Sequence, residues 1–181
     1  MSCLSLTSNI CRGCRDNAGG IKKIYAANVC EITSITEYTG SDSDKLGSIQ
    51  TIVNGGSWYE LNPNKNSSNW TENINASVEN GTIFYEQVVT AVFGKNDQSL
   101  RNTIEEIGQS ELLLVVEDNN GILWVIGEIG NGAVVTGGTS ASGTAWGDLN
   151  GWNLTLTCDS RVPAKTLLTK PEIPGESVCG C

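Results

Sequence analysis

The sequence predicts a mostly β fold, namely a β-sandwich or open barrel with one flanking α-helix and extended terminal arms. Short segments in which apolar and polar residues alternate recur along the chain, as expected for strands with one buried face. Glycine is abundant, at 21 of 181 residues, whereas proline occurs four times. That composition favours strands joined by tight turns. A single segment has the periodicity of an amphipathic helix.

The predicted strands are short and are separated by polar turns. Asn54-Gly55-Gly56 is a tight-turn signal between two of them, and residues 62–69 form a loop by composition. The longest strand signal, residues 82–93, is apolar on both faces and is expected to be buried on both sides. The predicted strands are residues 21–27, 30–35, 49–53, 58–61, 70–78, 82–93, 111–117, 122–127, 133–136 and 152–157.

The one predicted helix follows the longest strand. Asp97 can cap its N-terminus, and Gly108 fits a C-terminal stop. Leu100, Ile104 and Ile107 recur at positions i, i+4 and i+7. This apolar stripe is narrow, so the helix is expected to lie on the outside of a sheet.

The chain divides into one domain with an arm at each end. Residues 1–20 are expected to form an irregular N-terminal arm that contains cysteines, and residues 21–162 the β domain. Within the domain, residues 137–143 are rich in glycine, serine and threonine and are predicted to be flexible. The pattern ends at Pro163, so residues 163–181 are expected to be an extended C-terminal tail.

Composition and charge disfavour several classes of function. The net charge of −9 repels phosphate, so tight nucleic-acid binding is not expected. Histidine is absent, which removes the usual general base and the commonest metal ligand. No apolar run approaches the ~20 residues of a membrane span, and the N-terminus shows no secretion signal. We therefore expect a non-enzymatic protein that is not inserted in a membrane.

Seven cysteines include one close pair near each end of the chain. Cys11 and Cys14 have Cys-x-x-Cys spacing, and Cys179 and Cys181 have Cys-x-Cys spacing. If the two ends meet, four thiolates could hold a tetrahedral zinc ion. Disulfides are a second interpretation, although a protein that folds in a reducing cytosol rarely keeps them. Free cysteines on the two arms are the third.

Other polar motifs have a structural interpretation beside each chemical one. The Asp-x-Asn-Gly sequences at residues 118–121 and 148–151 offer oxygen ligands for calcium, but they lack the spaced carboxylates of a calcium loop. They are also typical of tight turns. The acidic pairs at residues 105–106 and 117–118 are placed on an exposed helix face and at a turn, so we interpret them as solvated surface.

Several short motifs resemble tail-tube-like structural proteins of tailed bacteriophages, including crAss-like and other phages of Bacteroidetes hosts. The resemblance covers residues 19–164. The motifs that carry it are residues 19–25, 85–89, 101–105, 117–121, 124–128, 139–144, 148–157 and 162–164.

The resemblance implies a β-sandwich or open barrel of tail-tube type whose copies join into a ring or tube. Such a subunit is part of the virion, in the phage tail or neck, and is assembled in the host cytoplasm. Its expected partners are further copies of itself and the neighbouring tail, neck or portal proteins. Genome DNA would pass through the ring without specific binding. The cysteine-bearing ends have no counterpart in the general pattern, which favours a specialised ring over a generic tube repeat.

The five tryptophans support a rival function. An all-β domain rich in Trp, Asn and Gly could be a carbohydrate-binding or receptor-binding module of a virion or secreted protein, which stacks sugars on exposed rings. Trp124 and Trp152 lie in predicted strands with apolar neighbours and are expected in the core. Trp146 lies beside the glycine-rich stretch and is the best candidate for an exposed ring.

Overall fold

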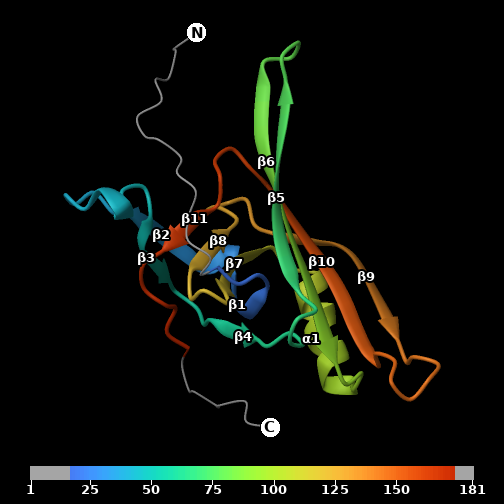
Figure 1. Cartoon of the computed structure of the whole chain (residues 1–181). Helices are drawn as coiled ribbons and strands as arrows, with labels where there is room; N and C mark the ends of the chain where they lie inside the picture. The colour runs from blue at the N-terminus through green and yellow to red at the C-terminus, as the bar shows by residue number, and fades with distance from the viewer. Residues whose placement is uncertain (1–16, 174–181) are drawn as a thin grey trace.

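In the computed structural model, which describes residues 17–173, the chain forms two β-sheets and one α-helix (Figure 1). The strands are β1 (Ile21–Asn28), β2 (Ile32–Glu37), β3 (Ile49–Asn54), β4 (Tyr59–Leu61), β5 (Asn69–Ser77), β6 (Thr82–Gly94), β7 (Leu112–Asp118), β8 (Leu123–Ile126), β9 (Val134–Ala141), β10 (Gly151–Ser160) and β11 (Lys165–Leu167). The helix is α1 (Gln98–Gly108). Short 3-10 turns lie at Val29–Glu31 and Ser43–Lys45.

The larger sheet has seven strands in the order β2-β3-β11-β8-β7-β1-β4, and the smaller has four in the order β5-β6-β10-β9. One apolar core lies between the two sheets and α1. It contains Leu114 and Val116 of the larger sheet, Val89 and Leu154 of the smaller sheet, and Ile104 of the helix. The architecture is a β-sandwich or open barrel with one helix, which confirms the predicted fold class.

The seven-stranded sheet holds a second core on its other face. Tyr25, Leu113 and Val115 there have no exposed surface, and they pack with Ile32 and Ile49. All five residues belong to strands of the same sheet, so the sheet must curl around them. This curl explains why β7, at its centre, is buried along six of its seven residues.

The four-stranded sheet is buried on one face only. Val89, Ala91 and Phe93 of β6 alternate with half-buried neighbours. The prediction that this strand is buried on both sides is therefore wrong. Its first residues form one arm of a β5–β6 hairpin that projects beyond the other elements (Figure 1), and there Ile83 is 57% exposed. The apolar residues on the second face of β6 are thus partly exposed and do not pack against another layer of the described chain.

The helix forms as its capping and periodicity predict. The Asp97 side chain accepts a hydrogen bond from the Leu100 amide (2.9 Å), as an N-cap residue does. Ile104 is buried, and Leu100 and Ile107 pack beside it against the core. The Arg101 guanidinium lies 5.6 Å from the ring centroid of Trp152. The helix therefore covers one end of the core face of β10, as expected for a helix outside a sheet.

The predicted tight turn at residues 54–56 forms between β3 and β4, and the Asn54 side chain accepts from the Gly56 amide (2.9 Å). The two strands do not pair with each other, because β3 pairs with β2 and β11 whereas β4 pairs with β1. Two other predictions about local elements need correction. The residues predicted to be flexible, 137–143, largely belong to β9, which pairs with β10 through Ala141. Within the predicted C-terminal tail, Lys165–Leu167 form β11 between β3 and β8. Long-range pairing creates each of these elements.

Candidate functional site

The four-stranded sheet presents two long edges. Strands β5 and β9 lie at its two ends, and within residues 17–173 no backbone hydrogen bond joins their outer edges to another segment. Natural sheets protect such edges with lysine, proline or short strands. Strand β9 has eight residues with no charged residue and no proline. These edges are suited to pairing with another chain.

The face of this sheet that points away from the core is polar and lacks basic residues. Side chains alternate between the two faces of a strand, so the neighbours of the buried residues point outward. Glu86 and Asp159 lie there, directly opposite each other in register, and Asn73 Nδ2 donates to Glu86 (3.2 Å). This outward face comprises Asn69, Thr71, Asn73, Asn75, Ser77, Thr82, Phe84, Glu86, Val88, Thr90, Val92, Val134, Thr136, Gly137, Thr139, Ala141, Asn153, Thr155, Thr157 and Asp159.

The loop between β9 and β10, residues 142–150, presents a fully exposed tryptophan. Nothing in residues 17–173 covers the side chain of Trp146, so the predicted exposed ring is confirmed. The Asp148 carboxylate accepts hydrogen bonds from the amides of Ala145 (2.7 Å) and Thr144 (2.8 Å). These bonds hold the pKa of Asp148 below its ordinary value. The carboxylate thus serves as a backbone clamp for the loop.

The first Asp-x-Asn-Gly sequence is also a structural turn. One oxygen of Asp118 accepts from the amides of Asn120 (2.8 Å) and Ile122 (2.9 Å). The Asn120 side chain accepts from the Ala18 amide (2.8 Å) and donates to the Ala18 carbonyl (2.9 Å). The turn between β7 and β8 therefore fastens residues 17–20 to the domain.

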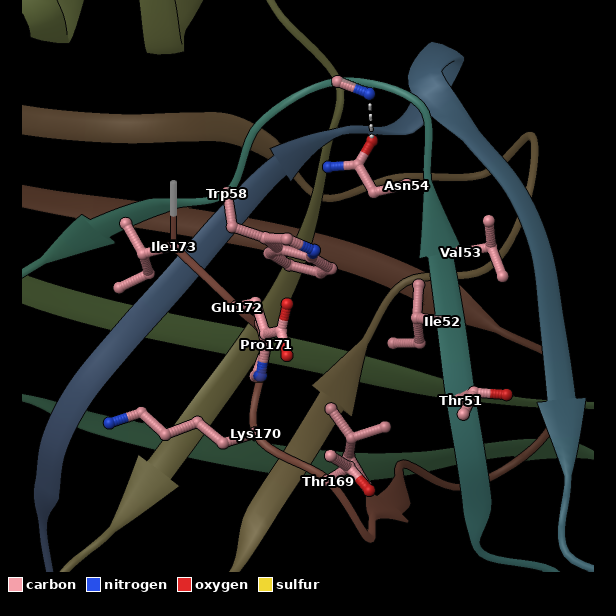
Figure 2. Close-up of a pocket in the computed structure, with 12 residues that line it drawn as sticks. Thr51, Ile52, Val53, Asn54, Trp58, Thr169, Lys170, Pro171, Glu172 and Ile173 are labelled. Carbon is pink, nitrogen blue, oxygen red and sulfur yellow. Dashed lines mark hydrogen bonds between the residues drawn. The ribbon is translucent and has the colours of Figure 1, made fainter. Parts of the chain in front are cut away.

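A pocket lies where residues 169–173 cross the curled sheet (Figure 2). Its volume is about 520 Å³, and Trp58, Ile52 and Ile173 are among its lining residues. The Asn54 side chain accepts from the Gly56 amide (2.9 Å), whereas its Nδ2 finds no acceptor in residues 17–173. The described part of the C-terminal segment lies against the curled sheet, where Ile173 packs on the second core.

A cluster of charged groups reinforces this contact. Glu117 is 8% exposed and accepts from Lys22 Nζ (2.6 Å) and Tyr25 Oη (3.1 Å). Burial opposes ionisation, but these two hydrogen bonds outweigh it and hold the pKa of Glu117 below its usual range. Burial, and then the bond to Glu117, raise the pKa of Tyr25. Lys170 lies over the Tyr25 ring at 5.1 Å, which ties the C-terminal segment to the cluster.

The four cysteines of the zinc or disulfide hypothesis, Cys11, Cys14, Cys179 and Cys181, lie outside the described residues. Within residues 17–173, Cys30 is exposed and Cys158 is buried, both as thiols. Burial, with the nearby carboxylates, raises the pKa of Cys158 to about 11, which makes it an unreactive core thiol. No group of three or more Cys, Asp or Glu side chains in the described part of the chain could hold a metal ion.

Comparison with known proteins identifies no family for this chain. No protein-family model, curated protein sequence or solved structure matches the chain. In the described part of the chain, no helix is long and apolar enough to cross a membrane. The features that bear on function are therefore the edges, the outward face and the loop of the four-stranded sheet. The sequence indicated the loop, through Trp146. It indicated only the start of the edge strand β9, at residues 133–136, because the two glycines that follow hide the strand character of the rest.

Proposed function

We propose that this protein is a structural subunit of a phage virion that assembles into a ring or tube of the tail or neck. Its partners are further copies of itself and neighbouring tail, neck or portal proteins. The ring provides a conduit through which genome DNA passes without specific binding. The observation that carries the proposal is the pair of free edges, β5 and β9, on one four-stranded sheet.

The directions in which the edge strands run suit ring formation. All three pairings within the sheet are antiparallel, so β5 and β9 run in opposite directions. When β9 of one copy pairs with β5 of the next, the antiparallel alternation continues across the junction. Edges that differ make a head-to-tail contact, and such contacts generate a closed ring when the rotation closes. Closure into a barrel also removes the exposed edges.

The outward face then supplies the wall of the conduit. It has two carboxylates, Glu86 and Asp159, and no lysine or arginine among its residues. A wall without basic groups gives the DNA phosphates no partner for ion pairing. The hydroxyl and amide groups of its Thr and Asn residues keep the surface wetted. These properties favour passage of DNA over adhesion.

The test is the assembly state of the full chain. Negative-stain microscopy and native mass spectrometry at increasing concentration should show ring-shaped oligomers of one size. Thr139→Lys places a charge at an exposed position of the outer edge strand β9 and should abolish the rings. Asn102→Lys adds the same charge to an exposed position of α1 and should leave them intact. A chain that stays monomeric at high concentration would refute the proposal.

Trp146 favours a second candidate, a carbohydrate-binding or receptor-binding module. Its ring is fully exposed and could stack on a sugar. Trp58 is buried, and Trp70, Trp124 and Trp152 pack against the core, so no second indole of the described chain stands beside it. Binding of a glycan array by a stable monomer, lost on Trp146→Ala, would favour this candidate over the ring.

A further inference from the structure

The loop that carries Trp146 has a fixed backbone, although nothing in the described chain covers the indole ring. The Asp148 carboxylate binds two backbone amides of the loop at 2.7 and 2.8 Å, and the Asp148 amide donates back to the Ala145 carbonyl (3.1 Å). Gly143 adopts a positive φ of 73° at the start of this clamp. A large exposed apolar ring on a loop with an ordered backbone has the properties of an interface anchor, because the loop backbone loses little conformational entropy when the ring binds.

An apolar groove lies between β4 and α1. Its floor includes Leu61, Leu100 and Ile107, which are half-buried side chains packed on the core. The groove has a volume of about 580 Å³, within the range of pockets that hold small ligands. At its rim stands Lys95, whose side chain is 87% exposed. An indole in this groove would cover the apolar floor and could contact the lysine through a cation–π interaction.

The Trp146 loop and this groove lie at the same end of the molecule, and the amide of Lys95 at the groove rim donates to the Asn150 carbonyl of the loop (2.8 Å). From there the groove extends to Leu61 and Asn62, which precede β5. Figure 1 shows the loop after β9 at the lower right, and β4 and α1 at the lower left and centre, with the β5–β6 hairpin at the other end. Strand β9 ends at this loop, and β5 begins near the groove, after the segment 62–68 that lines it in part. Antiparallel pairing of β9 with β5 of a neighbour brings these two ends together.

We infer that Trp146 of one copy binds the β4–α1 groove of the next copy in the ring. This inference rests on the proposed ring and names its anchor. The occupant is a second copy of this chain, because the same edge pairing that continues the sheet delivers the loop to the groove. Each junction then combines a backbone ladder, which sets the register, with one buried aromatic side chain. Buried tryptophans contribute much of the binding energy in many interfaces.

Two pairs of variants test the contact by the concentration at which half of the full chain is assembled, measured by mass photometry. Trp146→Ala should raise this concentration by about 30-fold or more, the effect of removing a hot-spot residue, whereas Trp146→Tyr should largely preserve assembly. Thr103→Arg fills the groove from an exposed helix position and should act like Trp146→Ala. Asn102→Arg adds the same charge to the helix outside the groove-lining residues and should assemble normally.

A crosslink locates the anchor directly. The photoreactive amino acid p-benzoylphenylalanine at position 146 of the full chain should, on irradiation of assembled rings, attach to a peptide of residues 60–64 or 93–107 from another copy. Rings that form normally with Trp146→Ala, or that crosslink at other segments, would overturn the inference and leave the ring intact. A chain that forms no rings would overturn both the inference and the proposed function.

Discussion

The two sheets of this protein differ in how they use their surfaces. The seven-stranded sheet buries both faces, one against the helix and the smaller sheet and the other inside its own curl. The four-stranded sheet buries one face and leaves the other face, both edges and a projecting hairpin open. The comparison shows that stability is concentrated in one sheet, whereas the surface available for assembly is concentrated in the other.

The contrast is visible in two single strands. Strand β7 has four consecutive residues, 113–116, without exposed surface. Strand β9 has two adjacent glycines, and seven of its eight residues are exposed. Strand β7 would form in almost any context that supplied an apolar partner, whereas β9 pairs with β10 alone. Substitutions in the seven-stranded sheet should therefore change mainly stability, whereas those in the four-stranded sheet should change mainly assembly.

The largest effect is expected at the centre of the seven-stranded sheet. Leu113→Ala removes a side chain with no exposed surface and leaves a cavity in the second core, so we expect a loss of about 3 kcal/mol of unfolding free energy. Ile83→Ala makes a similar truncation on the projecting hairpin, where the residue is 57% exposed, and should cost less than about 0.5 kcal/mol. Urea denaturation measures both. Equal losses would contradict the division between the sheets.

A smaller loss is expected where the four-stranded sheet is most tightly packed. A Cβ atom on Gly151 would lie 2.0 Å from the Phe93 carbonyl oxygen, so Gly151→Ala must displace β10 from β6. We expect a loss of about 1–3 kcal/mol. Gly147→Ala is the matched control, because no atom lies within 4 Å of its Cβ position. Thermal unfolding followed by circular dichroism compares the pair, and unchanged stability of Gly151→Ala would show that this junction is loose.

Local patterns predicted much of this fold, and long-range pairing accounts for what they missed. The β7–β8 hairpin and α1 follow from turn chemistry, alternation and the Asp97 cap, which act over a few residues. Strand β11 has three residues and no periodicity, and its pairing partners, at positions 49 and 123–125, lie far away in sequence. The start of β9 was predicted, at residues 133–136, but its second half was missed because glycines lower strand propensity, although pairing with β10 compensates.

The candidate site was predictable to the same extent. Trp146 could be expected to be exposed, because its neighbours are small and polar and no alternation places it in a strand. The ordered backbone of its loop could not be predicted, because it depends on the Asp148 carboxylate turning back to two amides. The groove between β4 and α1 brings together residues about forty positions apart in sequence, and single-sequence patterns contain no information on such a juxtaposition.

The charged cluster on the seven-stranded sheet should make stability depend on pH. The pKa of Glu117 is lowered in the folded state, so its contribution is present above the ordinary carboxyl pKa of about 4.3 and is lost as the pH falls through the folded value. Glu117→Gln keeps the shape but removes the charge, and should cost about 1–2 kcal/mol at pH 7. Denaturation at pH 7 and pH 3 should show this difference shrinking at low pH, and a constant difference would contradict it.

The smallest effect on stability should occur on the outward face of the four-stranded sheet. A substitution there should change the interaction with DNA while leaving the subunit folded. Glu86 and Asp159 are like charges directly opposite each other, an arrangement that destabilises a strand pair. Glu86→Lys replaces this repulsion with an attraction and should stabilise the subunit by about 0.5 kcal/mol.

The same substitution places cations on the wall proposed to face DNA, so Glu86→Lys rings should retain DNA at low salt and release it as the salt rises. Glu79→Lys, at the exposed turn of the hairpin, changes the charge equally away from that wall and should not retain DNA. Gel-shift assays of assembled rings make the comparison. Retention by both variants would show that net charge alone governs adhesion, whereas retention by neither would place the outward face outside the conduit.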